Sequence, residues 1–440
     1  MTGIARQPRS ARESALLDLA RKYLPGGVRN ATTSPEYAMV IKEGRGARIW
    51  DVSGNAYIDY LLGSGPLLLG HAHPSVVAAV RDHLERGSTY LMVNEPAILL
   101  AEAIVQAVPC AEKVCFHSTG SEATLFAMRL ARAYRKRDTI LKFEGAFHGM
   151  SDYALMSNQW TRAPKEYPAP VPNSVGIPRS VAGTVCIAPF NDINTTTAII
   201  EKYHDDLAGI IVEPMQRTIS PLPGFLAALR QAATHYDIPL IFDEVVTGFR
   251  LAYGGAQEYY GVVPDLCALG KTLSSGHPLS VLCGREYLMS AVDPARQLSG
   301  DYVALTGTYS GNPLSCVAAL ATLNELRAAG VYDKLFATGR QLKDSLQRLL
   351  DEAGIPASVT GEPPAFEVWF TEHEITDFRS TLSSDAAMHA RLTELLLERG
   401  IVKAHEKFFV SLAHTSEDVE CTVEAFGSAI DEMARNRGAL

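Results

Sequence analysis

Two short apolar runs, each ending at charged residues, are the most informative feature of the hydrophobic pattern. Residues 240–242 are Leu-Ile-Phe, and this run stops at Asp243 and Glu244. Residues 266–269 are Leu-Cys-Ala-Leu, and a glycine and then Lys271 follow them. Apolar strands that alternate with helices and end in a charge are typical of a parallel α/β sheet. Because the carboxyl ends of such strands carry the ligand site, we expect Asp243 and Lys271 to meet over one crevice.

The alternation of apolar runs with amphipathic segments continues on both sides of this stretch. Further strands are expected at 113–117, 139–143, 184–188, 209–213 and 280–284. Helices are expected between them, for example at 224–236. This order of elements predicts an α/β fold with one large domain, which we place at residues 61–311.

The two ends of the chain follow other patterns. Long helices predicted at 314–328 and 331–352 are followed by short strands mixed with helices, which indicates a smaller α+β domain over 312–440. Near the N-terminus, a meander of three strands is predicted at 37–41, 47–51 and 57–60, with a turn at Gly44. We expect residues 1–60 to pack beside the smaller domain.

A lysine and an aspartate at two strand ends have a specific chemical use. Enzymes that use pyridoxal 5'-phosphate (PLP) need a lysine amine that forms a Schiff base with the cofactor aldehyde. They also need a carboxylate that keeps the pyridine nitrogen protonated, so that the ring can act as an electron sink. Lys271 and Asp243 are therefore the candidate catalytic residues. The alternative is that both are ordinary residues at strand ends.

The turn after the strand at 113–117 is a candidate phosphate site. It contains Gly120 and Ser121 and leads into a helix whose apolar face begins at Ala123. Backbone N–H groups and a hydroxyl at a helix N-terminus bind anions well. The alternative is that Ser121 only caps the helix, since serine is a common N-cap residue.

The strand at 139–143 leads into a glycine-flanked segment that contains Phe147 and His148. An aromatic ring and an imidazole at a strand end can form a flat surface on which a cofactor ring stacks. The alternative places Phe147 in the core and makes His148 a satisfied loop residue. Residues 151–183 then contain five prolines and show no helical period, which predicts a long loop that covers the site or forms a subunit contact.

Composition narrows the class of protein further. The chain of 440 residues is 47% hydrophobic and 20% charged, with a formal net charge of −9, which suits a soluble enzyme and disfavours nucleic acid and membrane as partners. The seven cysteines are scattered and form no CxxC, which favours buried free thiols in a reducing compartment over disulfides or a zinc site. His71 and His73 have no acidic or cysteine partner at ligand spacing. We expect a cytoplasmic protein without a metal.

A series of short motifs extends along nearly the whole chain. They are Leu69-Gly70-His71-Ala72-His73-Pro74, Ser121-Glu122-Ala123, Phe143-Glu144-Gly145, Val212-Glu213-Pro214, Asp243-Glu244-Val245, Thr247-Gly248-Phe249-Arg250, Gly270-Lys271 and Ser310-Gly311-Asn312-Pro313. In these motifs the chain resembles the class III PLP-dependent aminotransferases. Within that family it is most similar to the glutamate-1-semialdehyde 2,1-aminomutases.

The resemblance implies fold type I of the PLP-dependent transferases. Such a fold has a large domain with a mainly parallel seven-stranded sheet, a smaller α+β domain, and a homodimer with shared active sites and PLP at the subunit interface. Lys271 would form the Schiff base and carry the proton of the 1,3-shift, and Asp243 would pair with the pyridine nitrogen. The other implied cofactor-binding residues are Gly120 and Ser121 at the phosphate, Phe147 on the ring, Val245 on the opposite ring face, His148 and Glu213 nearby, and Thr308 at the phosphate of the other subunit.

Departures from the family pattern fall on the substrate side. In the aminomutases, an arginine a few residues after Pro-Gly-Gly-Val binds the substrate carboxylate, whereas here Arg29 follows that motif directly. Arg29 is therefore a candidate carboxylate anchor at a shifted position. The Pro-rich 151–183 segment around Trp160, a second candidate substrate-binding residue, replaces the small-residue gating loop of the aminomutases. Further candidates on this side are His277, His405 and Lys407.

Three functional hypotheses follow. The main one is an aminotransferase that moves an amino group between an amino acid donor and a keto or aldehyde acceptor by a ping-pong Schiff-base mechanism. The alternative is an aminomutase of the glutamate-1-semialdehyde type, which transfers the amino group within one molecule. A noncatalytic relative is disfavoured, because a decayed site would lose a lysine such as Lys271 first.

Overall fold

The structure is a computed structural model that describes residues 6–27, 35–159, 166–404 and 407–437. It divides into two compact units. The small unit comprises Met1–Pro74, Ala329–Ile375 and Ser383–Leu440, and the large unit comprises Ser75–Ala328 and Thr376–Leu382. Compactness alone does not define a folding domain, so the domains at 1–60, 61–311 and 312–440 stay a prediction.

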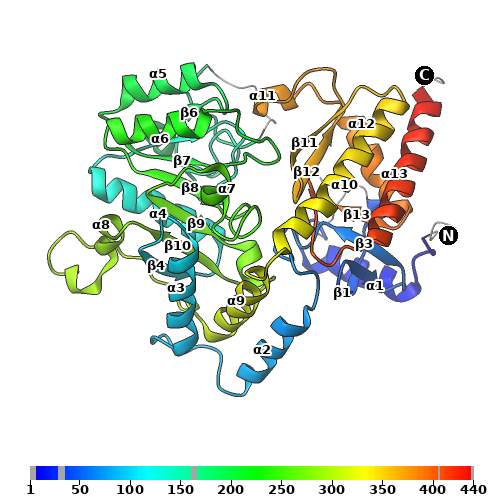
Figure 1. The fold of residues 1–440 in the computed structure, drawn as a ribbon, viewed down its shortest axis with the longest axis horizontal. Coiled ribbons are helices and arrows are strands. Elements are labelled where there is room, and N and C mark those ends of the chain that lie inside the picture. Colours follow the sequence, from blue (N-terminus) through cyan, green and yellow to red (C-terminus); the bar gives the residue numbers. More distant parts are fainter. Residues whose placement is uncertain (1–5, 28–34, 160–165, 405–406, 438–440) are drawn as a thin grey trace. The chain divides into compact units, whose positions relative to one another are not determined.

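A seven-stranded sheet forms the centre of the large unit. Its strands, in spatial order, are β4 (Lys113–His117), β10 (Ser280–Gly284), β9 (Leu266–Leu269), β8 (Leu240–Glu244), β7 (Leu207–Val212), β5 (Thr139–Phe143) and β6 (Val185–Ala188). Strand β10 is antiparallel to both neighbours, and the other pairings are parallel. The predicted mainly parallel seven-stranded sheet is therefore confirmed. Strands β8 and β9 are neighbours, so their carboxyl ends lie side by side (Figure 1).

Helices cover both faces of this sheet, and most residues of its strands are accordingly apolar. Alternation along β5 points Ile140 toward α4 (Gly120–Arg135) and Phe143 toward α6 (Phe225–His235). Helix α5 (Ile193–Tyr203) lies beside α6 (Figure 1). The other helices of the large unit are α2 (Pro74–Leu84, which starts at the unit boundary), α3 (Glu95–Ala107), α7 (Ala256–Tyr260), α8 (Glu286–Met289), α9 (Pro313–Leu326), α11 (Phe378–Thr381) and the 3-10 helices η2 (Arg179–Thr184), η3 (Lys271–Ser274), η4 (Ser290–Val292) and η5 (Pro294–Arg296).

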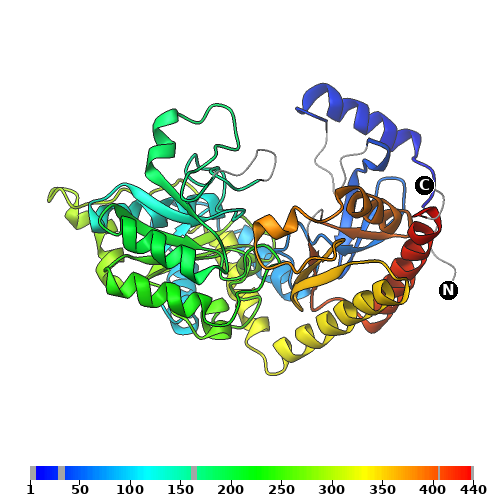
Figure 2. The same cartoon turned by 90° about the horizontal axis from the view of Figure 1, so that it is seen from above.

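Within its described residues, the small unit contains two sheets and four α-helices. One sheet has the order β1 (Ile41–Arg45), β2 (Arg48–Asp51), β3 (Ala56–Tyr60) and β13 (Ile401–Lys403), and the other has the order β11 (Ser358–Glu362), β12 (Ala365–Trp369) and β14 (Phe408–Phe409). Its helices are α1 (Ala11–Tyr23), α10 (Val331–Glu352), α12 (Ala386–Glu398), α13 (Ser416–Arg437) and the 3-10 helix η1 (Pro35–Tyr37). Helix α13 packs against both α10 and α12 (Figure 2). The parallel pairing of β3 with β13 joins the N-terminal meander to the C-terminal part of the chain.

The predicted first strand of the meander is wrong in its bounds. Strand β1 covers Ile41–Arg45, and the turn falls at Gly46, which has a φ of +57°, and not at Gly44. Gly44 lies within β1 against the imidazole of His71, where a Cβ atom would come within 2.6 Å of Nδ1. The glycine in the strand thus makes room for a ring, and the next glycine makes the turn.

The Pro-rich segment is irregular, as predicted. Its described parts consist of turns, bends and η2, with one isolated bridge between Met156 and Pro172. Tyr167 of this segment donates a hydrogen bond of 2.7 Å to Glu144, which also accepts a bond of 2.6 Å from Arg379 Nε. This cluster ties residues 376–382 to the large unit, although the chain on both sides of them belongs to the small unit.

Among the described residues, no single helix is long and apolar enough to cross a membrane. Helices α9 and α10, taken together as a bent pair, do pass the criteria of length and composition.

Candidate active site

The carboxyl end of β8 holds a buried pair of ionisable groups. His148 Nδ1 lies 2.8 Å from Asp243 Oδ2, and both side chains are at most 5% exposed. The other carboxylate oxygen, Oδ1, accepts a hydrogen bond of 3.1 Å from the backbone N–H of Val245. His148 Nε2 is buried and has no partner among the described residues. The imidazole thus orients one carboxylate at the end of a central strand.

Lys271 begins the 3-10 helix that follows β9, next to that strand end. Its backbone has a φ of +44°, a conformation that side-chain-bearing residues seldom adopt and that is often found at functional sites. Burial, together with the charge of Arg250, lowers the pKa of Lys271 to about 8, against the opposing effects of Asp243 and Glu213. An amine with this pKa is a good nucleophile near neutral pH.

Arg250 connects the two strand ends. Its guanidinium is fully buried and donates to the backbone oxygen of Val246, which follows β8, at 2.9 Å. It also donates to the hydroxyl of Thr272, the residue after the lysine, at 3.0 Å. The arginine therefore fixes the loop after Asp243 relative to the segment that carries Lys271.

The N-terminus of α4 lies against the same region. Thr119 is the N-cap, in a capping box with Glu122, so the alternative that Ser121 only caps the helix is wrong. The Ser121 hydroxyl instead accepts a hydrogen bond of 3.1 Å from the N–H of Met150. Gly120 packs on Val245, since a Cβ atom there would lie 3.0 Å from both of its methyl groups. The first-turn N–H groups of Gly120 and Ser121 have no acceptor within the helix.

Phe147 and Glu213 complete this group. The N–H of Phe147 donates to the buried carboxylate of Glu213 at 3.1 Å, which holds the segment from β5 against the end of β7. Phe147 is 37% exposed, so the alternative that it belongs to the core is wrong. The guanidinium of Arg217 lies 5.3 Å from the ring centre, and its Nε donates to the backbone oxygen of Gly145 at 3.3 Å.

Lys142 is a residue of this region that the sequence argument missed. It lies on β5, is 1% exposed, and its amine donates to the backbone oxygens of Ala146 at 3.2 Å and Met156 at 2.6 Å. Burial lowers its pKa to about 7. A charged residue inside the apolar run of residues 139–143 was the available signal. The lysine anchors the segment that carries Phe147 and His148.

The structure does not bring every predicted site residue into this group. Thr308 is exposed, and no hydrogen bond joins its side chain to the residues above within the described chain. Arg29, Trp160 and His405 lie outside the described residues. His277 is partly buried in the segment that follows Lys271, and this burial lowers the pKa of its imidazole. Lys407 is buried in the small unit, and its amine lies 5.8 Å from the ring centre of Phe409.

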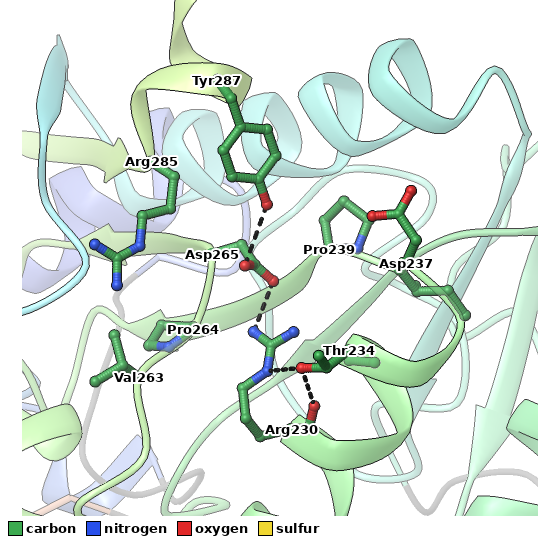
Figure 3. Close-up of a pocket in the computed structure, with 11 residues that line it drawn as sticks. Arg230, Thr234, Asp237, Pro239, Val263, Pro264, Asp265, Arg285 and Tyr287 are labelled. Carbon is green, nitrogen blue, oxygen red and sulfur yellow. Dashed lines mark hydrogen bonds and ion pairs between the residues drawn. The ribbon is translucent and has the colours of Figure 1, made fainter.

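A pocket of about 300 Å³ lies away from this group (Figure 3). Asp265 is central to it and accepts a hydrogen bond of 2.7 Å from Arg230 and one of 3.2 Å from Tyr287. Asp265 directly precedes β9, whereas Lys271 follows it, so the two lie beyond opposite ends of that strand. The pocket contains none of the predicted site residues.

The arrangement offers three chemical groups to one ligand. An amine with a lowered pKa can react with a carbonyl, a carboxylate can pair with a protonated nitrogen, and free N–H groups at the start of α4 can bind an anion. The unpaired His148 Nε2 and the exposed Phe147 ring lie beside these groups. An aromatic aldehyde with a ring nitrogen and a phosphate matches all three, and the residues present therefore fit PLP.

The fold and these groups define a cofactor-dependent enzyme of the α/β class. The chain belongs to the class III aminotransferase family, whose model matches residues 30–430. The resemblance seen in the sequence motifs is therefore confirmed.

Curated relatives agree with this assignment. A glutamate-1-semialdehyde 2,1-aminomutase of Methanothermobacter thermautotrophicus is 42% identical over 416 residues, which are 92% of this chain and 96% of the relative. One of Desulforamulus reducens is 38% identical over 444 residues, which are 97% of this chain and 99% of the relative.

Solved structures of two aminotransferases are also similar to this chain. An omega-transaminase from Sphaerobacter thermophilus has a TM-score of 0.91 at 35% identity and covers 98% of this chain and 99% of its own. A β-phenylalanine aminotransferase from Variovorax paradoxus has a TM-score of 0.86 at 27% identity, with 98% and 95% covered. The predicted fold class, fold type I of the PLP-dependent transferases, is confirmed.

Proposed function

We propose that this chain is a PLP-dependent aminotransferase that moves an amino group between an amino acid donor and a keto or aldehyde acceptor in two half-reactions. The observation that carries the proposal is Lys271, whose amine has a pKa lowered to about 8 at the end of a strand next to Asp243. An ordinary surface lysine is almost fully protonated near neutral pH and is therefore unreactive as a nucleophile. With a pKa of about 8, a substantial fraction of the Lys271 amine is neutral near pH 7.5.

We assign the cofactor-binding roles as follows. The N–H groups of Gly120 and Ser121 at the start of α4 hold the phosphate, helped by the helix dipole. Phe147 would stack on one face of the pyridine ring and Val245 would pack on the other, and the contact of Val245 with Gly120 supports this assignment. Thr308 reaches the phosphate bound by the partner subunit, and its exposure supports that role.

We assign the buried carboxylate of Asp243 to the pyridine nitrogen of PLP. Asp243 would pair with the protonated ring nitrogen, and its contacts with His148 and with the N–H of Val245 fix the direction in which its carboxylate faces. Glu213 acts on the cofactor site indirectly, because its carboxylate accepts a hydrogen bond from the backbone N–H of Phe147 and so positions that residue. Each of these groups is fixed before a ligand arrives, so little reorganisation is needed during the reaction.

PLP supplies an aldehyde that takes up the amino group and a ring that withdraws electrons from the substrate carbon. The protein supplies the proton transfer. With PLP bound, the Lys271 amine, neutral in part near physiological pH, would take the proton from the substrate carbon that bears the nitrogen and deliver it to the carbon on the other side of that nitrogen. The charge of Arg250 acts against full protonation of that amine.

Substrate recognition is assigned to residues outside the group that would hold the cofactor. Arg29 is the proposed carboxylate anchor, through a bidentate contact, and Trp160 the proposed neighbour of the substrate side chain. His277, His405 and Lys407 are further candidates. Because departures from the aminomutase motifs fall at Arg29 and in the segment around Trp160, we propose a substrate other than glutamate 1-semialdehyde.

The second candidate function is that of an aminomutase, which transfers the amino group within one molecule. It is favoured by the curated relatives, which are aminomutases 38% and 42% identical over nearly the whole chain. Single-turnover spectra of the PLP-loaded protein separate the two. An aminotransferase converts the cofactor with a separate amino donor and returns it with a separate keto acceptor. Conversion of glutamate 1-semialdehyde without any second substrate would establish the aminomutase instead.

We further propose a homodimer with shared active sites. Tyr90, Leu91, Met92 and Val93 form a run of exposed apolar side chains, of which the last three are 78%, 76% and 83% exposed. Contiguous exposed apolar residues of this kind mark interaction surfaces. All seven cysteines are free, which suits a reducing compartment and supports a cytoplasmic location.

A further inference from the structure

Three cysteines that are far apart in the sequence meet inside the large unit. Cys110, Cys267 and Cys283 are each 0% exposed, and their sulfur atoms all lie within 4.8 Å of one another. The sequence pattern suggested scattered thiols, because the spacing along the chain gives no sign of this contact. The thiols are free, as predicted, but these three are clustered.

Sheet pairing explains the cluster. Cys267 on β9 and Cys283 on β10 are directly opposite each other in an antiparallel pair, so their side chains project from the same face. Cys110 lies in the connection between α3 and β4, and its N–H donates to Gln257 Oε1 on α7 at 3.0 Å. Two strands and one loop therefore hold the three sulfur atoms in place.

The cluster lies on the opposite sheet face from the carboxylate assigned to the cofactor. Cys267 pairs with Phe242 across the β8–β9 ladder, and Phe242 and Glu244 project from one face while Asp243 projects from the other. Accordingly, Cys267 Sγ lies 3.9 Å from Glu244 Oε1. The thiols and the cofactor groups are thus separate sites within one sheet.

The surroundings of the thiols include an unused hydrogen-bond donor. Gln257 is 1% exposed, and while its Oε1 accepts from Cys110, its Nε2 has no partner among the described residues. Leaving a buried amide N–H without an acceptor is unfavourable. A metal-bound thiolate accepts such hydrogen bonds, and metal ligands in proteins are usually supported by them.

We propose that Cys110, Cys267 and Cys283 form a binding site for a thiophilic d10 cation such as Cu⁺ or Zn²⁺. Three sulfur atoms around one ion at about 2.3 Å lie up to about 4 Å apart, so the observed cluster needs to contract by less than about 1 Å. Each thiol loses its proton to the solvent as its metal–sulfur bond forms, and no oxidant or reductant is needed. Cu⁺ takes the three thiolates alone, whereas Zn²⁺ takes Glu244 as a fourth ligand.

The pocket of Figure 3 is lined by residues that are close to two of the thiols along the chain. Asp265 precedes Cys267 by two positions, and Arg285 follows Cys283 by two positions. Two residues of extended chain span about 7 Å.

The test titrates the PLP-loaded, reduced and chelator-treated protein with Cd²⁺, Zn²⁺ and Cu⁺ separately. The site predicts one tightly bound ion per chain, sulfur-to-metal charge-transfer absorption with Cd²⁺, and an unchanged cofactor spectrum. Cys110→Ser, Cys267→Ser and Cys283→Ser should each weaken binding by roughly 100-fold or more, because even outer-shell contacts are worth 10–100-fold. Cys316→Ser is the matched control, since this thiol is equally buried and lies outside the cluster.

A measurement on the unsubstituted protein avoids any folding defect of the variants. X-ray absorption of the Cd²⁺-loaded protein should show three sulfur neighbours around the ion. Coordination by oxygen and nitrogen alone, or binding that Cys316→Ser weakens as much as the other three substitutions, overturns the proposal. A disulfide between two of the three cysteines in protein isolated without reductant would make the cluster a redox pair and would also overturn it.

Discussion

His148 Nδ1 lies 2.8 Å from Asp243 Oδ2, and both groups are buried at the end of the central strand β8. The two residues come from segments 95 positions apart, the loop after β5 and the end of β8. The contact fixes which way the carboxylate faces, and it leaves Oδ1 to the backbone N–H of Val245. In our account, this carboxylate governs how well the cofactor ring withdraws electrons.

Removal of the imidazole should therefore weaken both cofactor binding and turnover. A hydrogen bond to a charged group is worth about 1.5–3 kcal/mol, so His148→Leu should lower kcat/KM by roughly 10- to 100-fold. His148→Gln should restore part of this loss, because its amide can still donate to Asp243. Steady-state kinetics and the cofactor Kd measure the effect. His235→Leu, at an exposed position on α6, is the control, and equal losses in both leucine variants would contradict the role.

The lowered pKa of Lys271 predicts the pH dependence of cofactor loading. With a pKa of about 8, roughly a quarter of the amine is neutral at about pH 7.5, compared with about 0.1% for an ordinary lysine. Because only the neutral amine attacks the aldehyde, the rate at which the apoprotein takes up PLP should rise with pH and level off above about pH 8 to 9.

Stopped-flow absorbance of apoprotein mixed with PLP measures this rate. The reaction of N-acetyl-lysine amide with PLP over the same range is the matched control, and it should keep rising to about pH 10. A protein profile that follows the control would show that the environment of Lys271 does not lower its pKa.

Lys142→Met should loosen the segment that carries Phe147 and His148. The substitution keeps the length of the side chain and leaves the buried oxygens of Ala146 and Met156 without this donor, at a cost of about 1–3 kcal/mol for each in the free energy of unfolding. We expect a higher cofactor Kd in addition to lower stability. Denaturant unfolding and PLP titration measure the two effects.

Lys343→Met is the control for that substitution. Lys343 is partly buried in the small unit and donates to the backbone oxygen of Gly361 at 2.6 Å. The Lys343→Met protein should lose stability and keep its affinity for the cofactor. If Lys142→Met lowered stability but left the cofactor Kd unchanged, the lysine would support the fold without positioning the site.

The exposed apolar run at residues 90–93 predicts the effect of a charge in the proposed dimer interface. Val93→Asp would desolvate a carboxylate on association, which is costly without a partner, and should shift the protein to monomers with little activity. Light scattering after size exclusion gives the mass. Val175→Asp is the control, because Val175 is 88% exposed and lies outside this run. A Val93→Asp protein that stays dimeric and active would place the interface elsewhere.

The large sheet was predictable because its signals are local. Apolar runs that stop at Asp243 and Lys271 predict both the strands and the end at which the candidate site lies, and the structure places the two strands next to each other. The N-cap of α4 was missed by two positions, since Thr119 and Ser121 are equally suitable by type and only the contact with Glu122 selects between them.

What the sequence did not predict depends on contacts between distant segments. Gly44 lies in strand β1 and not in the turn, because the imidazole of His71 packs against it. No local sequence pattern indicates this contact. The bond between Arg379 and Glu144 attaches residues 376–382 to the large unit across 235 positions. The three clustered thiols depend on strand register in the same way.

The central claim is a covalent bond between the Lys271 amine and the aldehyde of PLP. Borohydride reduction of the PLP-loaded protein, followed by proteolysis and mass spectrometry, tests it most directly. The account predicts a single pyridoxyl adduct, on the peptide that contains Lys271, and its loss in Lys271→Ala. An adduct on another lysine, such as Lys142, or no adduct in a protein that turns over, would contradict it.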